Sequence, residues 1–191
     1  LREAAARYIS EHTGLDFSAP EIVVTCGAKQ AIYNALRLVL NPGDKALIPA
    51  PCWVTYPAQA TLCDGVPVIV PPNVDGSIDV AGLSTQMANA RVLILCNPSN
   101  PSGQVLSQSE LQQIGALAQE HGTLIIAAPQ WGRRDHRNLG RQLRLLRSGD
   151  GGASSAFGHV AAGGGGVGGS LASVERFDGG ALSAWALVAS M

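Results

Sequence analysis

Short apolar runs alternate with amphipathic segments along the first 127 residues of the chain. Buried parallel strands read as continuous hydrophobic stretches, because helices cover both of their faces. Runs of this kind occupy residues 22–25, 45–48, 92–96 and 123–127. A further run between Pro67 and Pro71 predicts a strand near the boundary of the sheet, since proline cannot donate a ladder hydrogen bond. The alternation predicts an α/β fold with a layered, mostly parallel sheet.

The segments between these runs have the periodicity of helices. Residues 1–12 form one such segment, and a shorter one covers 83–88. The helix that begins at Ala28 has its apolar positions on one face: Ile32, Ala35, Leu36 and Val39. Ser107 and Glu110 form a capping box that opens the last helix. Its expected inward residues are Leu111, Ile114, Leu117 and Ala118.

The segment 97–103, Asn-Pro-Ser-Asn-Pro-Ser-Gly, stands between the run at 92–96 and the helix that opens at Ser107. Open α/β sheets bind ligands at the carboxyl ends of their strands, which is where this turn is expected to lie. Its two prolines fix φ and Gly103 adds freedom, so the side chain of Asn100 can be held over a crevice. The same residue types are common in ordinary turns, so the segment alone does not distinguish a ligand site from a connection.

Two other connections have features that suit a ligand. Gly27 and Ala28 turn a strand into a helix, which offers free backbone N–H groups and the positive end of the helix dipole to an anion. Glycine also eases a tight turn, so this signal alone is weak. The connection 49–57 has three prolines together with Trp53 and Tyr56, and a stiff loop with flat side chains suits packing against a planar ring. Such aromatic residues are more often part of a core.

Charge and composition change near residue 128. Residues 1–127 have six Lys and Arg against ten Asp and Glu, whereas residues 128–191 have seven Arg against four acidic residues. The two parts therefore carry net charges of −4 and +3. We expect one domain at 1–127 and a Gly/Arg-rich tail at 128–191 that is not an independent domain.

The tail has six arginines from Arg133 to Arg147 and a run of glycine at 163–166, without usable periodicity. We expect residues 132–191 to be poorly ordered, or ordered only in short pieces that add no strand to the sheet, because they bury too little apolar surface. Arginine without lysine or interleaved aromatic residues does not favour nucleic-acid binding. One hypothesis for the abrupt shift is a change of reading frame in the gene, which the other two frames of the coding DNA would test.

Location and simple metal chemistry can also be predicted. The chain begins at Leu1 without a secretory signal, and it has no uncharged apolar stretch near the ~20 residues that a membrane helix needs. We therefore expect a cytoplasmic fragment without a membrane partner. Four cysteines without CxxC pairing are expected to be buried free thiols: Cys26, Cys52, Cys63 and Cys96. The four histidines are scattered without ligand spacing, so no metal site is expected.

Three motifs together resemble the class I aminotransferases, the fold-type-I enzymes that use pyridoxal phosphate. They are Val-Val-Thr-Cys-Gly-Ala-Lys-Gln at 23–30, Pro-Ala-Pro-Cys-Trp-Val-Thr-Tyr-Pro at 49–57, and the turn at 97–103. Their order and spacing are most similar to those of bacterial-type aspartate or aspartate/prephenate aminotransferases. The resemblance covers residues 1 to about 127 and implies an incomplete aminotransferase large domain.

The resemblance implies pyridoxal 5′-phosphate as the cofactor and assigns roles to five residues. Gly27, Ala28 and Lys29 would make backbone contacts with the cofactor phosphate. Trp53 would pack beside the pyridine ring, and Asn100 would donate a hydrogen bond to the ring 3-oxygen. The resemblance also implies transamination between an amino acid of the aspartate type and a 2-oxo acid, and a homodimer in intact members of the family.

The chain departs from the family after Ile126. Family members have an Asp there that pairs with the pyridinium nitrogen, followed by a Tyr, whereas this chain reads Ala-Pro-Gln-Trp at 128–131. The only lysines of the chain, Lys29 and Lys45, precede Asn100, although the Schiff-base lysine of the family lies well beyond this point. We therefore expect no catalytic residue, no covalent attachment of the cofactor and no transamination by this chain.

Three interpretations stay open from the sequence. The chain is an inactive, truncated or frame-disrupted piece of an aminotransferase, or it is a fragment that still binds pyridoxal phosphate weakly and non-covalently. The third is an unrelated doubly wound nucleotide-binding domain, which is disfavoured because no GxGxxG or P-loop motif follows the predicted strands.

Overall fold

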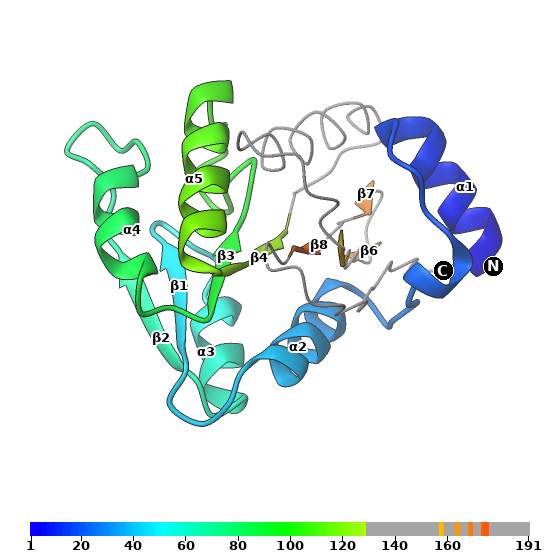
Figure 1. Ribbon diagram of the computed structural model, residues 1–191, viewed down its shortest axis with the longest axis horizontal. Coiled ribbons are helices and arrows are strands. Elements are labelled where there is room, and N and C mark those ends of the chain that lie inside the picture. Colours follow the sequence, from blue (N-terminus) through cyan, green and yellow to red (C-terminus); the bar gives the residue numbers. More distant parts are fainter. Residues whose placement is uncertain (129–156, 159–162, 165–167, 170–172, 176–191) are drawn as a thin grey trace.

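A parallel sheet organises residues 45–127 in the computed structural model, which describes residues 1–128 and four short strands further along the chain (Figure 1). The parallel strands are β1 (Lys45–Pro49), β2 (Val66–Val70), β3 (Val92–Leu95) and β4 (Leu124–Ala127). Their order is β2-β1-β3-β4, and β1 pairs with both β2 and β3. The predicted α/β fold with a mostly parallel sheet is confirmed, and β2 lies at an edge as its prolines suggested.

Five α-helices accompany the sheet in the described part of the chain. They are α1 (Arg2–Thr13), α2 (Ala28–Val39), α3 (Thr55–Leu62), α4 (Val80–Met87) and α5 (Gln108–His121), with a 3-10 turn η1 at Ala19–Glu21. The predicted capping box opens α5: Glu110 N–H donates to Ser107 Oγ at 3.2 Å, and Ser107 N–H donates to Glu110 Oε2 at 2.7 Å. Gly122 ends α5 with φ of 65°, a left-handed conformation that favours glycine.

Successive strand residues point to opposite faces of the sheet, so the strands take part in two cores. One core joins α2 and α3 to alternate residues of the strands: Ala46, Ile48, Val92, Ile94, Leu124 and Ile126. The other joins α4 and α5 to the intervening residues: Leu47, Leu93, Leu95, Ile125 and Ala127. The domain is therefore a helix–sheet–helix sandwich, whose buried central strands explain the continuous apolar runs in the sequence.

The predicted strand at 22–25 does not form. These residues follow η1 in an irregular course, and no strand in the described part of the chain pairs with them. Ile22 and Thr25 are buried, but Val23 is 41% exposed. A β-branched run becomes a strand only when a neighbour accepts its backbone hydrogen bonds, and the local sequence does not supply that neighbour.

The tail does extend the sheet. β8 (Ser173–Glu175) pairs antiparallel with β4, and β5 (Phe157–Gly158) pairs antiparallel with β8. β6 (Gly163–Gly164) and β7 (Gly168–Gly169) pair with each other. The expectation that the tail adds no strand to the sheet is therefore wrong, because the open edge of β4 can bond to extended backbone of any sequence. The rest of the tail, for which we expected poor order, lies outside the described residues.

Truncation of a central core residue should be costly. Ile94 lies in the middle of β3 and is 1% exposed, so Ile94→Ala is expected to lower the free energy of unfolding by about 2–5 kcal/mol. Val105 lies in a loop and is 58% exposed, so it serves as the control. Val105→Ala should change the free energy of unfolding by less than about 0.5 kcal/mol. Urea unfolding followed by circular dichroism measures both, and equal losses would contradict this description of the core.

Candidate functional site

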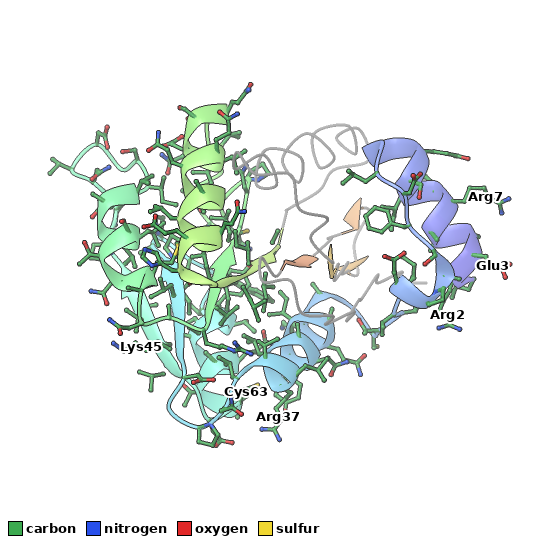
Figure 2. The ribbon with its side chains drawn as sticks, viewed as in Figure 1. Arg2, Glu3, Arg7, Arg37, Lys45 and Cys63 are labelled. Atoms are coloured by element: carbon green, nitrogen blue, oxygen red, sulfur yellow. The ribbon has the colours of Figure 1, made fainter. Side chains whose placement is uncertain are left out.

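Three connections meet at one edge of the parallel sheet. Parallel strands have their carboxyl ends at the same edge, so β1 leads into the loop 50–54 there and β3 leads into the turn 97–103. Helix α2 returns to the start of β1, which places its amino end at Gly27 on this side as well. Lys45 begins β1 and therefore lies at the opposite edge, and Figure 2 shows its side chain well apart from α2. The shared edge is where open α/β sheets bind ligands.

The amino end of α2 is open to an anion. Gly27 has φ of 88°, which favours glycine, and no side chain caps the helix. The Gly27 carbonyl accepts hydrogen bonds from the Ala31 N–H at 3.3 Å and from the Thr25 hydroxyl at 3.1 Å. Within the described chain, the N–H groups of Ala28 and Lys29 have no backbone acceptor. These N–H groups and the helix dipole together favour a bound negative charge.

Lys29 links the start of α2 to the loop after β1. Its Nζ lies 5.3 Å from the centroid of the Trp53 ring, within the range of a cation–π interaction. The Trp53 ring packs edge-on against Tyr56, with centroids 5.5 Å apart. On α3, Gln59 donates from Nε2 to the Lys29 carbonyl at 2.6 Å. The structure therefore brings the Gly27-Ala28-Lys29 turn beside Trp53.

The turn 97–103 attaches to the same loop. Asn97 is 3% exposed, and its Oδ1 accepts a hydrogen bond from the Leu106 N–H at 2.9 Å, which closes the base of the turn. The Ser99 hydroxyl donates to the Pro51 carbonyl at 3.3 Å. This bond joins the connection after β3 to the connection after β1.

Asn100 lies part-way along this turn and is half-buried. Its side chain makes no hydrogen bond to the rest of the described residues. The structure thus places the turn that contains Asn100 against the loop that contains Trp53, and among the described residues no hydrogen bond joins Asn100 to Trp53 or Gly27. A side-chain amide without a protein partner is available to a ligand.

A small cavity between the two loops was not predicted. Its volume is about 30 Å³, and it is lined by side chains that include Cys52, Tyr56, Cys96, Ser99 and Gln104. Burial raises the pKa of the Tyr56 phenol, and the neighbouring Cys96 raises it further. Burial, followed by Cys96, also raises the pKa of the Cys52 thiol. The sequence predicted where the strands end. It did not predict which residues of the two loops face each other.

The prediction of four buried free cysteines is wrong in part. All four are free, but only Cys63 is buried, whereas Cys52 and Cys96 are half-buried and Cys26 is exposed. The three exceptions belong to connections at the sheet edge, where helices do not cover both sides. Among the described residues, no cluster of three or more His, Cys, Asp or Glu side chains could hold a metal ion.

The end of β4 is apolar. Ala127 and Ala128 are 8% and 5% exposed, and the Ala128 N–H donates to the Leu95 carbonyl at 2.8 Å. Ala128 packs in the core formed with α2 and α3. The site edge therefore has no carboxylate where the described part of β4 ends.

Comparison with known proteins decides the family. The sequence profile of the family described as aminotransferase class I and II matches residues 1–127. The chain belongs to this family. A bifunctional aspartate aminotransferase and glutamate/aspartate-prephenate aminotransferase from Petunia hybrida is 40% identical over 133 residues, which cover 68% of this chain and 28% of the relative. The putative aminotransferase YugH of Bacillus subtilis is 37% identical over 131 residues, with coverage of 66% and 34%.

Solved aminotransferases have the same fold. A mutant aspartate aminotransferase of Thermus thermophilus superposes with a TM-score of 0.63 at 29% identity, covering 66% of this chain and 36% of that one. N-succinyldiaminopimelate aminotransferase from Mycobacterium tuberculosis gives 0.61 at 31% identity, with coverage of 66% and 34%. The aminotransferase-family chain thus spans about a third of the length of these relatives.

Membership in the family implies pyridoxal 5′-phosphate as the cofactor. It also removes the alternative of an unrelated nucleotide-binding domain. In the part of the chain that the structure describes, no helix has the length and apolar character needed to cross a membrane.

Tyr56 should make stability fall at high pH. An exposed tyrosine has a pKa of about 10, and the folded chain raises the pKa of Tyr56 above this value, so its contribution is complete below about pH 10 and is lost as pH rises further. Between pH 10 and 11, the wild-type chain should lose about 1 kcal/mol more stability than Tyr56→Phe. Urea unfolding at several pH values measures the difference, and parallel losses in both proteins would contradict the burial of this phenol.

Proposed function

We propose that this chain binds pyridoxal 5′-phosphate non-covalently at the carboxyl edge of its sheet, as the cofactor-binding part of an aspartate-type aminotransferase. The observation that supports this most is the open amino end of α2 beside Trp53, in a chain that the family profile matches over 1–127. We propose that residues 1–127 are part of the large domain of an aminotransferase. We propose that residues 128–191 are a tail attached to this domain and do not form a domain of their own.

The phosphate is expected at the start of α2. The N–H groups of Ala28 and Lys29 donate to its oxygens, and Gly27 allows the backbone to approach closely because it has no side chain. The helix dipole contributes about 0.3–1 kcal/mol, in addition to charge-assisted hydrogen bonds. Trp53 offers a flat face to the ring, and the free amide of Asn100 donates to the ring 3-oxygen. When bound, the cofactor supplies an electron sink for negative charge at a substrate α-carbon.

The residues present fit the phosphate end of the cofactor but not its ring nitrogen. A protonated ring nitrogen needs a negative partner, because an unpaired charge is costly in a buried setting. At the end of β4 the chain instead offers the buried methyl groups of Ala127 and Ala128. This polypeptide therefore binds the phosphate without stabilising the charge on the ring.

Neither lysine is suited to covalent attachment. A lysine that reacts with a carbonyl has to lose its proton, which desolvation promotes, and has to be held against the carbonyl carbon. Lys29 is exposed with its ammonium over Trp53, and Lys45 lies at the opposite edge of the sheet. We propose that the 191-residue polypeptide by itself does not catalyse transamination.

For an intact protein built on this domain, the proposed reaction is transamination between an aspartate-type amino acid and a 2-oxo acid. Relatives named as aspartate or aspartate/prephenate aminotransferases support this choice. We propose a homodimer and a cytoplasmic location for that intact protein by the same reasoning.

Borohydride reduction tests the absence of a covalent link. The purified chain is mixed with pyridoxal phosphate and reduced, and mass spectrometry should then find no stoichiometric adduct on Lys29 or Lys45. Only low modification, spread over the lysines and the amino terminus, is expected, because amines that reach solvent react without selectivity. One fully modified lysine, together with turnover of aspartate and 2-oxoglutarate, would contradict the proposal.

Equilibrium binding tests the phosphate site. Pyridoxal phosphate should bind at least about tenfold more tightly than pyridoxal, since only the former brings the dianion to α2. Inorganic phosphate should compete with pyridoxal phosphate, and ATP should show no tighter binding than inorganic phosphate. Equal affinities for pyridoxal and pyridoxal phosphate would overturn the assignment of the start of α2.

A further inference from the structure

Two buried side-chain polar atoms among the described residues have no hydrogen-bond partner, and both lie at the site edge. They are Oε1 of Gln59 and Nδ2 of Asn97. Folded proteins leave few such atoms, because each one costs about 1–3 kcal/mol relative to its solvated state. A glutamine on the apolar side of a helix is therefore a costly choice, and a role other than stability is expected for it.

Gln59 lies on the inner side of α3, where it faces α2. It is 6% exposed, and the next inner residues, Ala60 of α3 and Cys63 at its end, belong to the core that α2 shares with the sheet. A methionine or leucine would fill the same volume without leaving a buried oxygen unpaired. Gln59 instead donates from Nε2 to the carbonyl of Lys29 at 2.6 Å.

A second contact one helical turn later repeats this arrangement. Cys63 Sγ lies 3.9 Å from the Tyr33 carbonyl and donates weakly to it. Figure 2 shows Cys63 close to Arg37, in the region where α3 and α2 adjoin. Gln59 of α3 and Cys63 at its end are four positions apart, and they contact two carbonyls of α2 that are also four positions apart, which fixes both the height and the rotation of α2.

The first turn of α2 depends on this contact more than an ordinary helix start would. The preceding residues 22–25 are not paired with a strand in the described chain, and no side chain caps the helix. The apolar face of α2 holds the helix against the sheet. Apolar packing is not directional, so it does not stop the helix from sliding along its own axis. Two side-chain bonds, from the Thr25 hydroxyl to the Gly27 carbonyl and from the Cys26 N–H to Gln30 Oε1, join this turn only to its neighbours in sequence. The Gln59 bond is the directional contact that ties the turn to α3.

We propose that Gln59 is a positioning residue for the phosphate-binding turn, and this rests on the function proposed above. By holding the Lys29 carbonyl, Gln59 keeps the N–H groups of Ala28 and Lys29 pointed at one place before an anion arrives. A hydrogen bond to a peptide carbonyl also polarises the peptide, so the N–H of Gln30 in the same unit becomes a better donor. Binding then loses less entropy in ordering the turn.

The test compares Gln59→Met with Gln112→Met, a matched change at an exposed position of α5. Gln59→Met should keep its melting temperature within about 2 °C of wild type or raise it, because the unpaired oxygen is removed. Its Kd for pyridoxal phosphate should rise about fivefold or more, the value of one lost hydrogen bond. Gln112→Met should change neither quantity. A purely structural role would lower the melting temperature or leave the Kd unchanged, and either result would overturn the proposal.

Two further measurements keep the outcome decisive. Gln59→Glu has the same size, and it cannot donate at a pH where its carboxylate is ionised, so binding at high pH should weaken at least as much as in Gln59→Met. NMR spectra without ligand should show that Gln59→Met shifts the amide signals of residues 28–30 more than Gln112→Met does. If wild-type chain binds no pyridoxal phosphate, the proposed function fails, and unshifted amides at 28–30 would then reject the positioning role as well.

Discussion

The burial of β1, β3 and β4 between two helix layers is the constraint on which the rest of the structure depends. Alternate residues of each strand enter opposite cores, so neither face tolerates a polar side chain. Polar side chains are therefore kept out of the middle of these strands, and those of the candidate site lie in the connections at the strand ends and on α3. The parallel direction of the strands then places the loop 50–54, the turn 97–103 and the end of β4 at one edge.

Contacts between these connections are few and directional. The turn after β3 attaches through Ser99 to Pro51, and the start of α2 attaches through Lys29 to Trp53 and Gln59. Such contacts orient a helix end at modest energetic gain, because each net hydrogen bond contributes about 0.5–1.5 kcal/mol. The apolar cores thus provide stability, while single polar bonds set the geometry of the candidate site.

Much of the fold could be predicted because local signals agreed with the final packing. The run at 92–96 became the buried strand β3, and the box at Ser107 opened α5 as its side-chain spacing requires. The site segments were also visible, since proline and glycine mark connections and three such segments occur in the order and spacing of one family. These signals depend only on neighbours in sequence.

The rest depends on partners that are distant in sequence. The run at 22–25 has the composition of a strand but no paired neighbour, whereas Ser173–Glu175 pairs with β4 despite a tail of poor pattern. The helix α3 was not predicted, because the prolines before it suggested only a stiff loop. The role of Gln59 was also not predicted, because its contact joins it to Lys29, 30 positions away in the sequence.

The central claim is that the start of α2 holds the phosphate of pyridoxal 5′-phosphate. An NMR titration of isotopically labelled chain with this cofactor tests it most directly. The account predicts saturable changes that are largest at the amides of Gly27, Ala28 and Lys29, with smaller changes at the Trp53 indole and at Asn100. Changes centred on Lys45, or equal weak changes at all exposed amines with none at these three amides, would contradict it.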